Sequence, residues 1–469
     1  MFTVQEMRMP QKKVLLLTPA RQLLYASGSL AFTMLERLVL LYMPFYYLPP
    51  AEYNLPNLVP DRTYLGLFTI LGLALLVGRI FDGFTDPLIA SLSDNNRSRL
   101  GRRKLFLIIG GLPLALSTFL VFYPPDIGSE AFANGLWLTL AMVLFYLSFT
   151  TYVNPYLALL PELGHTDPLR INLSTMIAFF GITGLVIVTV IFPLVTAGLQ
   201  EVGYGLRSAY SNAVLIFAAF SALILYTATL GFSEKFHCLP VASQQLGTWQ
   251  SLRKTYKIRP FRIFLMGEMF LQFAMNLITL GLIYYAVVIF QREEGFITIL
   301  AAFAIGGALF CFPFVNLAAK KAGKKRVITA GVLSLFLSCL VIFLLSFNAG
   351  GIYLSISLAM FALAGFPLAV LTILINPTIA DLARAEYYKT GQHREAMFFG
   401  ARAIPLKLTI ALAGVVFTYL LSAFGKDIAQ PLGVQLSILV VAVAGLGSYL
   451  CFMRYPEDQV QKELKMWEQ

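Results

Sequence analysis

The sequence predicts an all-α polytopic membrane protein with twelve spanning helices arranged as two six-helix bundles. Its 469 residues are 58% hydrophobic and only 13% charged, with a mean hydropathy of +0.75, whereas soluble domains carry roughly 25% charged residues. A chain this apolar cannot cover itself with polar surface, so much of its exterior must face lipid. The longest polar segment, 232–260, lies between the sixth and seventh apolar runs. We therefore predict a bundle over 1–231, a linker over 232–260, and a second bundle with a tail over 261–469.

The twelve spans are predicted from the length of the apolar runs. A helix needs about 20 mostly apolar residues to cross a bilayer. Runs that meet this length cover 21–48, 63–92, 104–123, 134–160, 172–197, 207–231, 261–290, 296–318, 327–346, 352–383, 396–424 and 431–453. Turn-forming residues such as Leu48-Pro49-Pro50 separate them. The polar, basic segment 1–13 is followed by too short an apolar stretch to be a cleavable signal.

The distribution of basic residues predicts the orientation in the membrane. Of 35 Lys and Arg residues, only Arg62, Arg207, Arg292 and Lys426 fall in the loops of one side, and only Arg37, Arg79, Arg402 and Lys407 fall within spans. The others lie on the opposite side, and cytoplasmic loops carry the excess of Lys and Arg. We therefore expect both termini in the cytoplasm, in a plasma or inner membrane. The net charge of +11 then needs no nucleic-acid partner to explain it.

A weak internal repeat supports the division into halves. The basic segment 94–104 joins spans two and three, and 319–326 joins spans eight and nine at the matching place. Paired halves of this kind build transporters that rock around a midplane site. Segment 94–104 either only enforces topology or forms an inner-side latch that favours an outward-facing state. The predicted gating residues are Asp94, Gly101, Arg102, Arg103 and Asp381.

Three charged residues in the second span point to a cation site. A charged side chain deep in a span costs about 2.5–3.5 kcal/mol on insertion scales, so each needs a reason. Arg79, Asp82 and Asp86 are spaced by three and four residues, which places them on one helical face. A carboxylate there either takes a proton or keeps its charge by binding a cation. We predict coupling to Na⁺ or H⁺ at Asp82 and Asp86; the alternative is a structural Arg–Asp pair between helices.

Other charged residues also lie within predicted spans. Lys407 lies about a dozen residues from either end of span eleven. We predict that it faces the bundle, where it neutralises the acid pair or holds a polar substrate, although its long stem could also snorkel. Arg402 is predicted to be an interfacial anchor. Glu36 and Arg37 are expected to have different partners because helix neighbours point about 100° apart; a substrate contact and a structural pair both remain open.

Two Asn-Pro pairs and one further acid complete the candidates. Asn154-Pro155 and Asn376-Pro377 occupy corresponding places in spans four and ten. Proline bends a helix and frees a backbone carbonyl, so a packing bend and a binding role are both open. Glu268, early in span seven, is expected near the cytoplasmic mouth.

Other functional classes lack sequence support. No Gly-x-x-x-x-Gly-Lys-Ser/Thr motif occurs, so ATP is not the expected energy source. The four cysteines lack metal-ligand spacing, and His165, His237 and His393 all lie in predicted loops. We predict no enzyme activity, no cofactor and no resident metal.

Several stretches resemble one transporter family over essentially the whole chain. They are 78–87 with 94–103, Asn154 to Leu163, and Ile379 to Gly400 with Lys407. In these stretches the chain resembles the glycoside–pentoside–hexuronide:cation symporter family of the major facilitator superfamily, the group that contains melibiose permease. The resemblance implies two pseudo-symmetric bundles with alternating access, a coupling cation on Asp82 and Asp86, and Lys407 beside the cation and substrate sites. It also implies a monomer whose partners are a small-molecule solute and membrane lipid.

The chain departs from the sugar carriers of that family at three charged positions. Where they place an aspartate in span one, an aspartate in span four and an arginine in span five, this chain has Thr33, Val153 and Ile177. We predict cation-coupled symport of a small organic solute, a sugar or glycoside by family. The alternatives are an amphipathic lipid such as a lysophospholipid, which a related animal symporter carries, and a receptor that does not transport. The candidate substrate and coupling residues are Lys407, Arg79, Glu36, Arg37, Thr33, Asn154, Tyr156 and Asn376.

Overall fold

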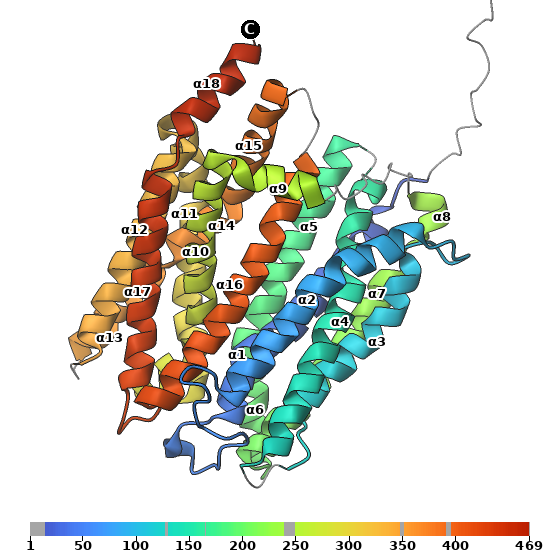
Figure 1. The fold of residues 1–469 in the computed structure, drawn as a ribbon. Coiled ribbons are helices and arrows are strands. Elements are labelled where there is room, and N and C mark those ends of the chain that lie inside the picture. The colour runs from blue at the N-terminus through green and yellow to red at the C-terminus, as the bar shows by residue number, and fades with distance from the viewer. Residues whose placement is uncertain are drawn as a thin grey trace, which may run out of the picture.

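The protein is a bundle of long, roughly parallel helices (Figure 1). The structure is a computed structural model, and it describes residues 15–126, 130–164, 166–238, 249–347, 351–390 and 395–468. The first fourteen residues and part of the predicted linker lie outside these described residues. So do His165 and residues 391–394, which include His393 and Arg394. The predicted all-α membrane fold is confirmed.

The first half contains six spans. They are α1 (Pro19–Tyr47), α2 (Ile70–Asn95), α3 (Lys104–Val121), α4 (Phe132–Leu163), a composite of α5 (Asp167–Val186), η2 (Ile187–Ile191) and α6 (Phe192–Glu201), and α7 (Leu206–Leu230). The short helix η1 (Ala51–Tyr53) follows α1, and α8 (Glu234–His237) follows α7. The fifth span contains a π-helical turn at η2, which the sequence pattern did not predict.

The second half also contains six spans. They are α10 (Arg259–Tyr284) continued by η3 (Tyr285–Ile289), α11 (Ile297–Ala322) preceded by η4 (Glu294–Phe296), α12 (Lys324–Leu345), a broken span of α13 (Gly351–Leu363), α14 (Gly365–Ile373) and α15 (Ile375–Thr390), then α16 (Glu395–Phe424) and α17 (Leu432–Met453). The helix α9 (Trp249–Lys257) precedes them and α18 (Glu457–Glu468) follows them.

Eleven of these spans are long and apolar enough to cross a membrane by length and composition. The remaining one, α2, is interrupted by Arg79, Asp82 and Asp86, yet it lies within the bundle against α4 and α16. It also starts later than predicted, at Ile70 rather than at residue 63. The reason is local: a bridge between Tyr64 and Phe68 closes a turn, and the Thr69 side chain then caps the helix by accepting from the Gly72 N–H at 3.0 Å.

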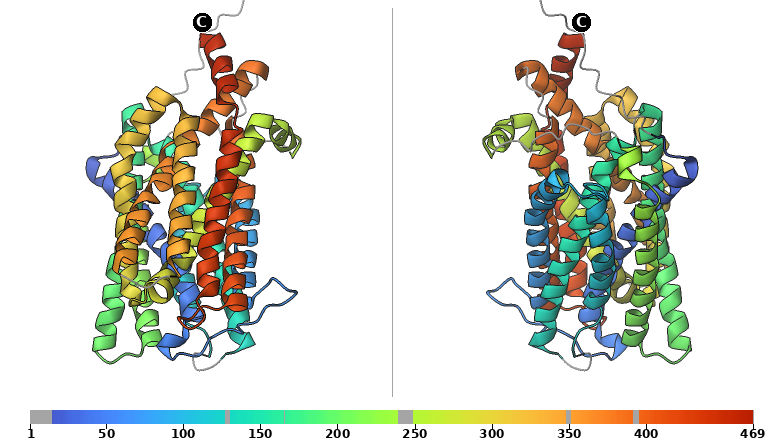
Figure 2. Two further views of the ribbon diagram at one scale, coloured as in Figure 1. Left: turned by 90° about the vertical axis from the view of Figure 1, so that its left-hand side faces the viewer. Right: turned by 90° about the vertical axis from the view of Figure 1, so that its right-hand side faces the viewer.

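Each half has its own packing, and the halves meet along two seams. In the first half α1 packs on α5 and α7, and α4 packs on α2 and α3; in the second, α17 packs on α10 and α12. The halves meet where α1 contacts α10 and where α2 contacts α16. In Figures 1 and 2 the helices α9 and α18 lie at the same end of the bundle. We name this the α18 end, and name the opposite end, which carries η1, the η1 end.

Polar contacts between the halves gather at the η1 end. The Tyr284 hydroxyl donates to the carbonyls of Pro44 at 3.1 Å and Leu48 at 2.8 Å. Asp61 pairs with Lys426, and the Ala51 N–H donates to Asp427 at 2.6 Å. Further along the seam, the Tyr210 hydroxyl donates to Glu294 at 2.6 Å and the Thr69 hydroxyl to Thr418 at 2.8 Å. The two halves are therefore closed upon each other at this end.

Candidate functional site

The acid pair of α2 lies against a polar stripe of α4. Thr150 on α4 donates to Asp82 at 2.7 Å and to Asp86 at 3.1 Å, and the Asn154 amide donates to Asp86 at 2.9 Å. The Asp82 side chain is 5% exposed and that of Asp86 is 28% exposed. Two carboxylates, a hydroxyl and an amide oxygen are ligands that hard cations prefer. The structure brings Asn154 to the acid pair, while Thr150 was not predicted.

Lys407 reaches this pair from the other half of the molecule. Its Nζ lies 2.9 Å from a carboxylate oxygen of Asp82, also pairs with Asp86, and donates to the Asp82 carbonyl at 3.1 Å. The lysine side chain is 19% exposed, so it points into the bundle rather than snorkelling along α16. Its ammonium contacts the same oxygens that a bound cation would need.

A chain of alternating charges extends from the acid pair to α1. Arg79 lies 3.5 Å from Asp82 and 3.7 Å from Glu36, and its guanidinium lies 4.5 Å above the Tyr146 ring. Glu36 in turn lies 3.8 Å from Arg37. The expectation that Glu36 and Arg37 have separate partners is therefore wrong, because both side chains are long enough to bridge the angle between neighbouring helix positions.

Arg37 borders an apolar cavity of about 200 Å³ between α1, the fifth span and the second half. Among the described residues that line it, Arg37 is the only charged one. The others come mainly from α10, α11, α12, α14 and α17: Leu41, Leu185, Thr189, Met275, Ile278, Thr279, Leu282, Tyr285, Ala301, Ala304, Ile305, Cys339, Ile342, Phe361, Ala364, Leu368, Ile438 and Val441. Of the predicted site residues, Arg37 is the one that the described lining of this cavity contains.

Two predicted substrate residues lie apart from the acid pair. Tyr156 is fully buried, stacks on Tyr25 with ring centroids 4.6 Å apart, and donates to the Tyr25 carbonyl at 2.8 Å. Its place is thus a packing contact between α1 and α4. Thr33 is half-buried on α1 and faces Gly181 of α5.

Asn376 belongs to a different cluster, centred on Arg402. The Arg402 Nε lies 2.8 Å from both carboxylate oxygens of Glu268, and its Nη1 donates to Asn376 at 2.9 Å. Glu268 is fully buried, and a buried carboxylate is costly without a counter-charge. The prediction that Arg402 is an interfacial anchor is therefore wrong: it joins α10, α15 and α16.

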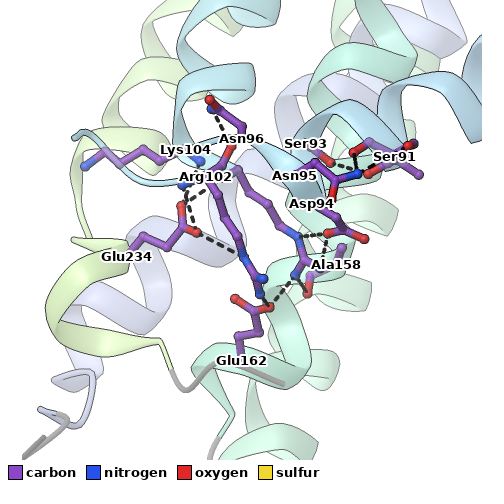
Figure 3. Close-up of polar contacts among 12 residues, drawn as sticks. Ser91, Ser93, Asp94, Asn95, Asn96, Arg102, Lys104, Ala158, Glu162 and Glu234 are labelled. Atoms are coloured by element: carbon purple, nitrogen blue, oxygen red, sulfur yellow. Dashed lines mark hydrogen bonds and ion pairs between the residues drawn. The ribbon is translucent and has the colours of Figure 1, made fainter. Parts of the chain in front are cut away.

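The predicted latch residues form an ion-pair cluster at the α18 end of the first half (Figure 3). Arg103 bonds Asp94 at 2.6 Å and Glu162 at 2.8 Å, and Arg102 pairs with Glu162 as well. All these partners belong to the first half. The expected latch thus ties α2, α3 and α4 to one another and does not join the two halves.

The same loop carries a helix cap that the sequence analysis missed. Gly101 has φ +120°, a conformation that favours glycine, and the next three backbone N–H groups donate to the Glu234 carboxylate at 2.9 to 3.2 Å. A carboxylate at a helix N-terminus is stabilised by the unpaired N–H groups and the helix dipole. Burial raises the pKa of the nearby Cys238 thiol, and the carboxylates of Glu234 and Glu162 raise it further.

The second half repeats this cap. Gly323 has φ +90°, and the N–H groups of Lys324 and Lys325 donate to Glu457 at 2.8 and 3.1 Å. Lys324 also bonds the predicted gating residue Asp381 at 2.5 Å. A sequence signal existed: Glu234 and Glu457 each follow the last residue of their half's final span, Leu230 and Met453, by the same interval.

Comparison with known proteins identifies relatives along the whole chain. Residues 24–456 match the model of the family described as MFS/sugar transport protein. The isoprimeverose transporter of Lactiplantibacillus pentosus is 21% identical over 84% of this chain and 82% of its own length. A symporter of Synechocystis sp. is 35% identical over 28% of this chain and 25% of its own length. The sodium-dependent lysophosphatidylcholine symporter 1 of Mus musculus is 39% identical over 18% of this chain and 16% of its own length.

The fold has counterparts among solved structures. The crystal structure of the nucleoside transporter NupG superposes with a TM-score of 0.65 at 12% identity, over 93% of this chain and 99% of that one. At this identity the likeness concerns the fold alone.

Proposed function

The chain belongs to the MFS/sugar transport protein family, and from this membership we propose that it is a secondary active symporter driven by Na⁺ or H⁺. The proposal is carried by one observation: Lys407 of the second half neutralises Asp82 and Asp86 of the first. An ammonium and a small cation compete for the same carboxylate oxygens. Binding of a cation therefore breaks a contact between the halves, and this is the event that a rocking transporter needs.

The charge chain supplies a route from the cation to the solute. Arg79 shares its charge between Asp82 and Glu36, and Glu36 stands between Arg79 and Arg37. When a cation binds the acid pair, Asp82 attracts Arg79 less, and Arg79 is attracted more strongly to Glu36. The negative charge of Glu36 then neutralises Arg37, at the cavity, less completely. Coupling of two ligands requires such a difference in interaction free energy.

Closure of the halves at the η1 end supports an inward-facing state. The basic loops at the α18 end are those expected in the cytoplasm, and the inter-half contacts of Tyr284, Asp61 and Lys426 lie at the other end. In this state cation and solute leave toward the α18 end. The reverse state requires the η1 contacts to break.

Two solute classes agree with the family. The isoprimeverose transporter and the description of the family support a sugar or glycoside, and the lysophosphatidylcholine symporter supports an amphipathic lipid. The apolar lining of the cavity favours the second class.

Substitution of Asp86 tests the symport mechanism. Thermal-shift screening of sugars and lysolipids with and without Na⁺ identifies a solute, whose cation-driven accumulation is then measured in proteoliposomes. We expect Asp86→Asn to abolish uphill accumulation, because a neutral amide does not balance the positive charge of a bound cation. Solute exchange without a gradient should persist. Asp458→Asn, the same change on an exposed position of α18, serves as the matched control. Full uphill accumulation by Asp86→Asn removes this residue from the mechanism.

A further inference from the structure

The cavity beside Arg37 offers few hydrogen bonds to a ligand. Its three hydroxyl groups are already used as donors or in a pair: Thr189 donates to the Leu185 carbonyl at 3.0 Å, Thr279 donates to Met275 at 2.9 Å, and Tyr285 lies 3.0 Å from the Ser437 hydroxyl. A polar group that loses water without a new partner costs about 1–3 kcal/mol. A sugar has several hydroxyls, so its transfer into this cavity is unfavourable.

An apolar ligand body gains free energy in the same place. Apolar side chains of α10, α11, α12 and α17 form much of the wall, and the aromatic rings of Tyr285 and Phe361 add to it from η3 and α13. Each CH₂ group that leaves water for such surroundings contributes about 0.8 kcal/mol. The wall therefore selects for a hydrocarbon part.

Arg37 supplies the one charged contact among the described lining residues. Its side chain is 32% exposed and borders the cavity. Its Nε is buried and has no hydrogen-bond partner among the described residues. Glu36, at 3.8 Å, lies beyond direct hydrogen-bond distance, and it also faces Arg79. A guanidinium with free donors matches a carboxylate or phosphate in a bidentate manner.

We propose that this cavity binds an amphipathic anion, with its carboxylate or phosphate on Arg37 and its hydrocarbon body between α10, α11, α12 and α17. The proposal rests on the proposed function, since it names the solute class that the symporter carries. The anion and Glu36 compete for Arg37. Solute binding therefore leaves Glu36 to Arg79, which connects the cavity to the acid pair.

The test measures binding of radiolabelled dodecanoate to the full chain in lipid nanodiscs, with empty nanodiscs to subtract partition into lipid. We expect saturable binding that unlabelled dodecanoate displaces, that dodecanol displaces at least tenfold less well, and that methyl β-xyloside does not displace. Displacement by lysophosphatidylglycerol at lower concentration than by dodecanoate identifies the anion as a lipid phosphate; the opposite order identifies a free carboxylate. Either order supports the proposal, and displacement by the xyloside at comparable concentration overturns it.

Variants separate the contribution of the Arg37 charge from that of the cavity volume. Arg37→Gln should weaken dodecanoate binding at least tenfold, and Arg37→Lys should weaken it less. Ala301→Phe, which fills the cavity wall without changing charge, should weaken dodecanoate and dodecanol alike. Arg292→Gln, on an exposed position near the η1 end, is the matched control. If Arg37→Gln does not fold, Arg37→Lys and Ala301→Phe decide, and unchanged dodecanoate affinity in both overturns the proposal.

This binding experiment needs no ion gradient. If neither Na⁺ nor pH changes the affinity for dodecanoate, the coupling mechanism is contradicted, but the proposal that the cavity binds an amphipathic anion still stands. If dodecanoate does not bind the cavity, the test of symport with Asp86→Asn remains valid.

Discussion

Replacement of Lys407 by glutamine tests whether its ammonium competes with the coupling cation. The variant removes the positive charge that lies 2.9 Å from Asp82 and keeps a side chain of similar length. A hydrogen bond to a charged group contributes about 1.5–3 kcal/mol, and about 1.4 kcal/mol corresponds to a tenfold change in affinity. Asp86 is more exposed than Asp82, so the Asp82 contact sets the magnitude. We expect the variant to bind Na⁺ about 10- to 100-fold more tightly.

The assay is a ²²Na⁺ binding isotherm on protein in nanodiscs, with proton release followed in parallel by a pH indicator. Lys462→Gln, on an exposed position of α18, is the control. Without Na⁺ the variant should also melt at a lower temperature, since breaking a buried pair costs about 3–5 kcal/mol, and Na⁺ should restore the melting temperature. A folded Lys407→Gln protein whose cation affinity is unchanged or weaker would refute the competition.

Three further predictions concern the connections around this site. Glu36→Gln should leave ²²Na⁺ binding intact but remove its increase in the presence of solute, because the link between Arg37 and Arg79 is lost; an increase of the usual size would contradict the charge chain. Tyr284→Phe removes a hydrogen bond of about 1 kcal/mol at the η1 end. The rate at which a thiol reagent labels a cysteine placed between the halves at this end should therefore rise about fivefold. An unchanged rate would show that other contacts hold this end closed. Glu457→Gln should lower the melting temperature through a loss of about 0.5–2 kcal/mol from the α12 cap, and an unchanged melting temperature would show that the carboxylate does not stabilise this helix end.

The twelve spans and the acid pair could be predicted because lipid penalises polar groups strongly. Apolar runs of sufficient length have no other explanation in such a chain, and charges within them are costly enough to signal a function. Spacing alone then placed Asp82 and Asp86 on one face, and the structure shows them facing α4 and Lys407. Their role as a cation site remains a prediction.

The partners of these charges could not be predicted in the same way. Thr150 is a neutral residue with no insertion penalty that would single it out. The pairing of Arg402 with Glu268 depends on the depth and rotation of two helices that are far apart in sequence, and the late start of α2 depends on a turn at Tyr64–Phe68. The carboxylate caps were detectable only by comparing where each half's last span ends.

Because α8 caps α3 and α18 caps α12, each half is closed off by its own terminal segment. The polypeptide between α8 and α9 therefore joins two halves that each contain their own helix cap. A soluble protein inserted there would leave the N-terminal ends of α3 and α12 capped. The C-terminus is less tolerant than its position outside the bundle suggests. Truncation before Glu457 would strip α12 of its carboxylate, so a fusion partner belongs beyond α18.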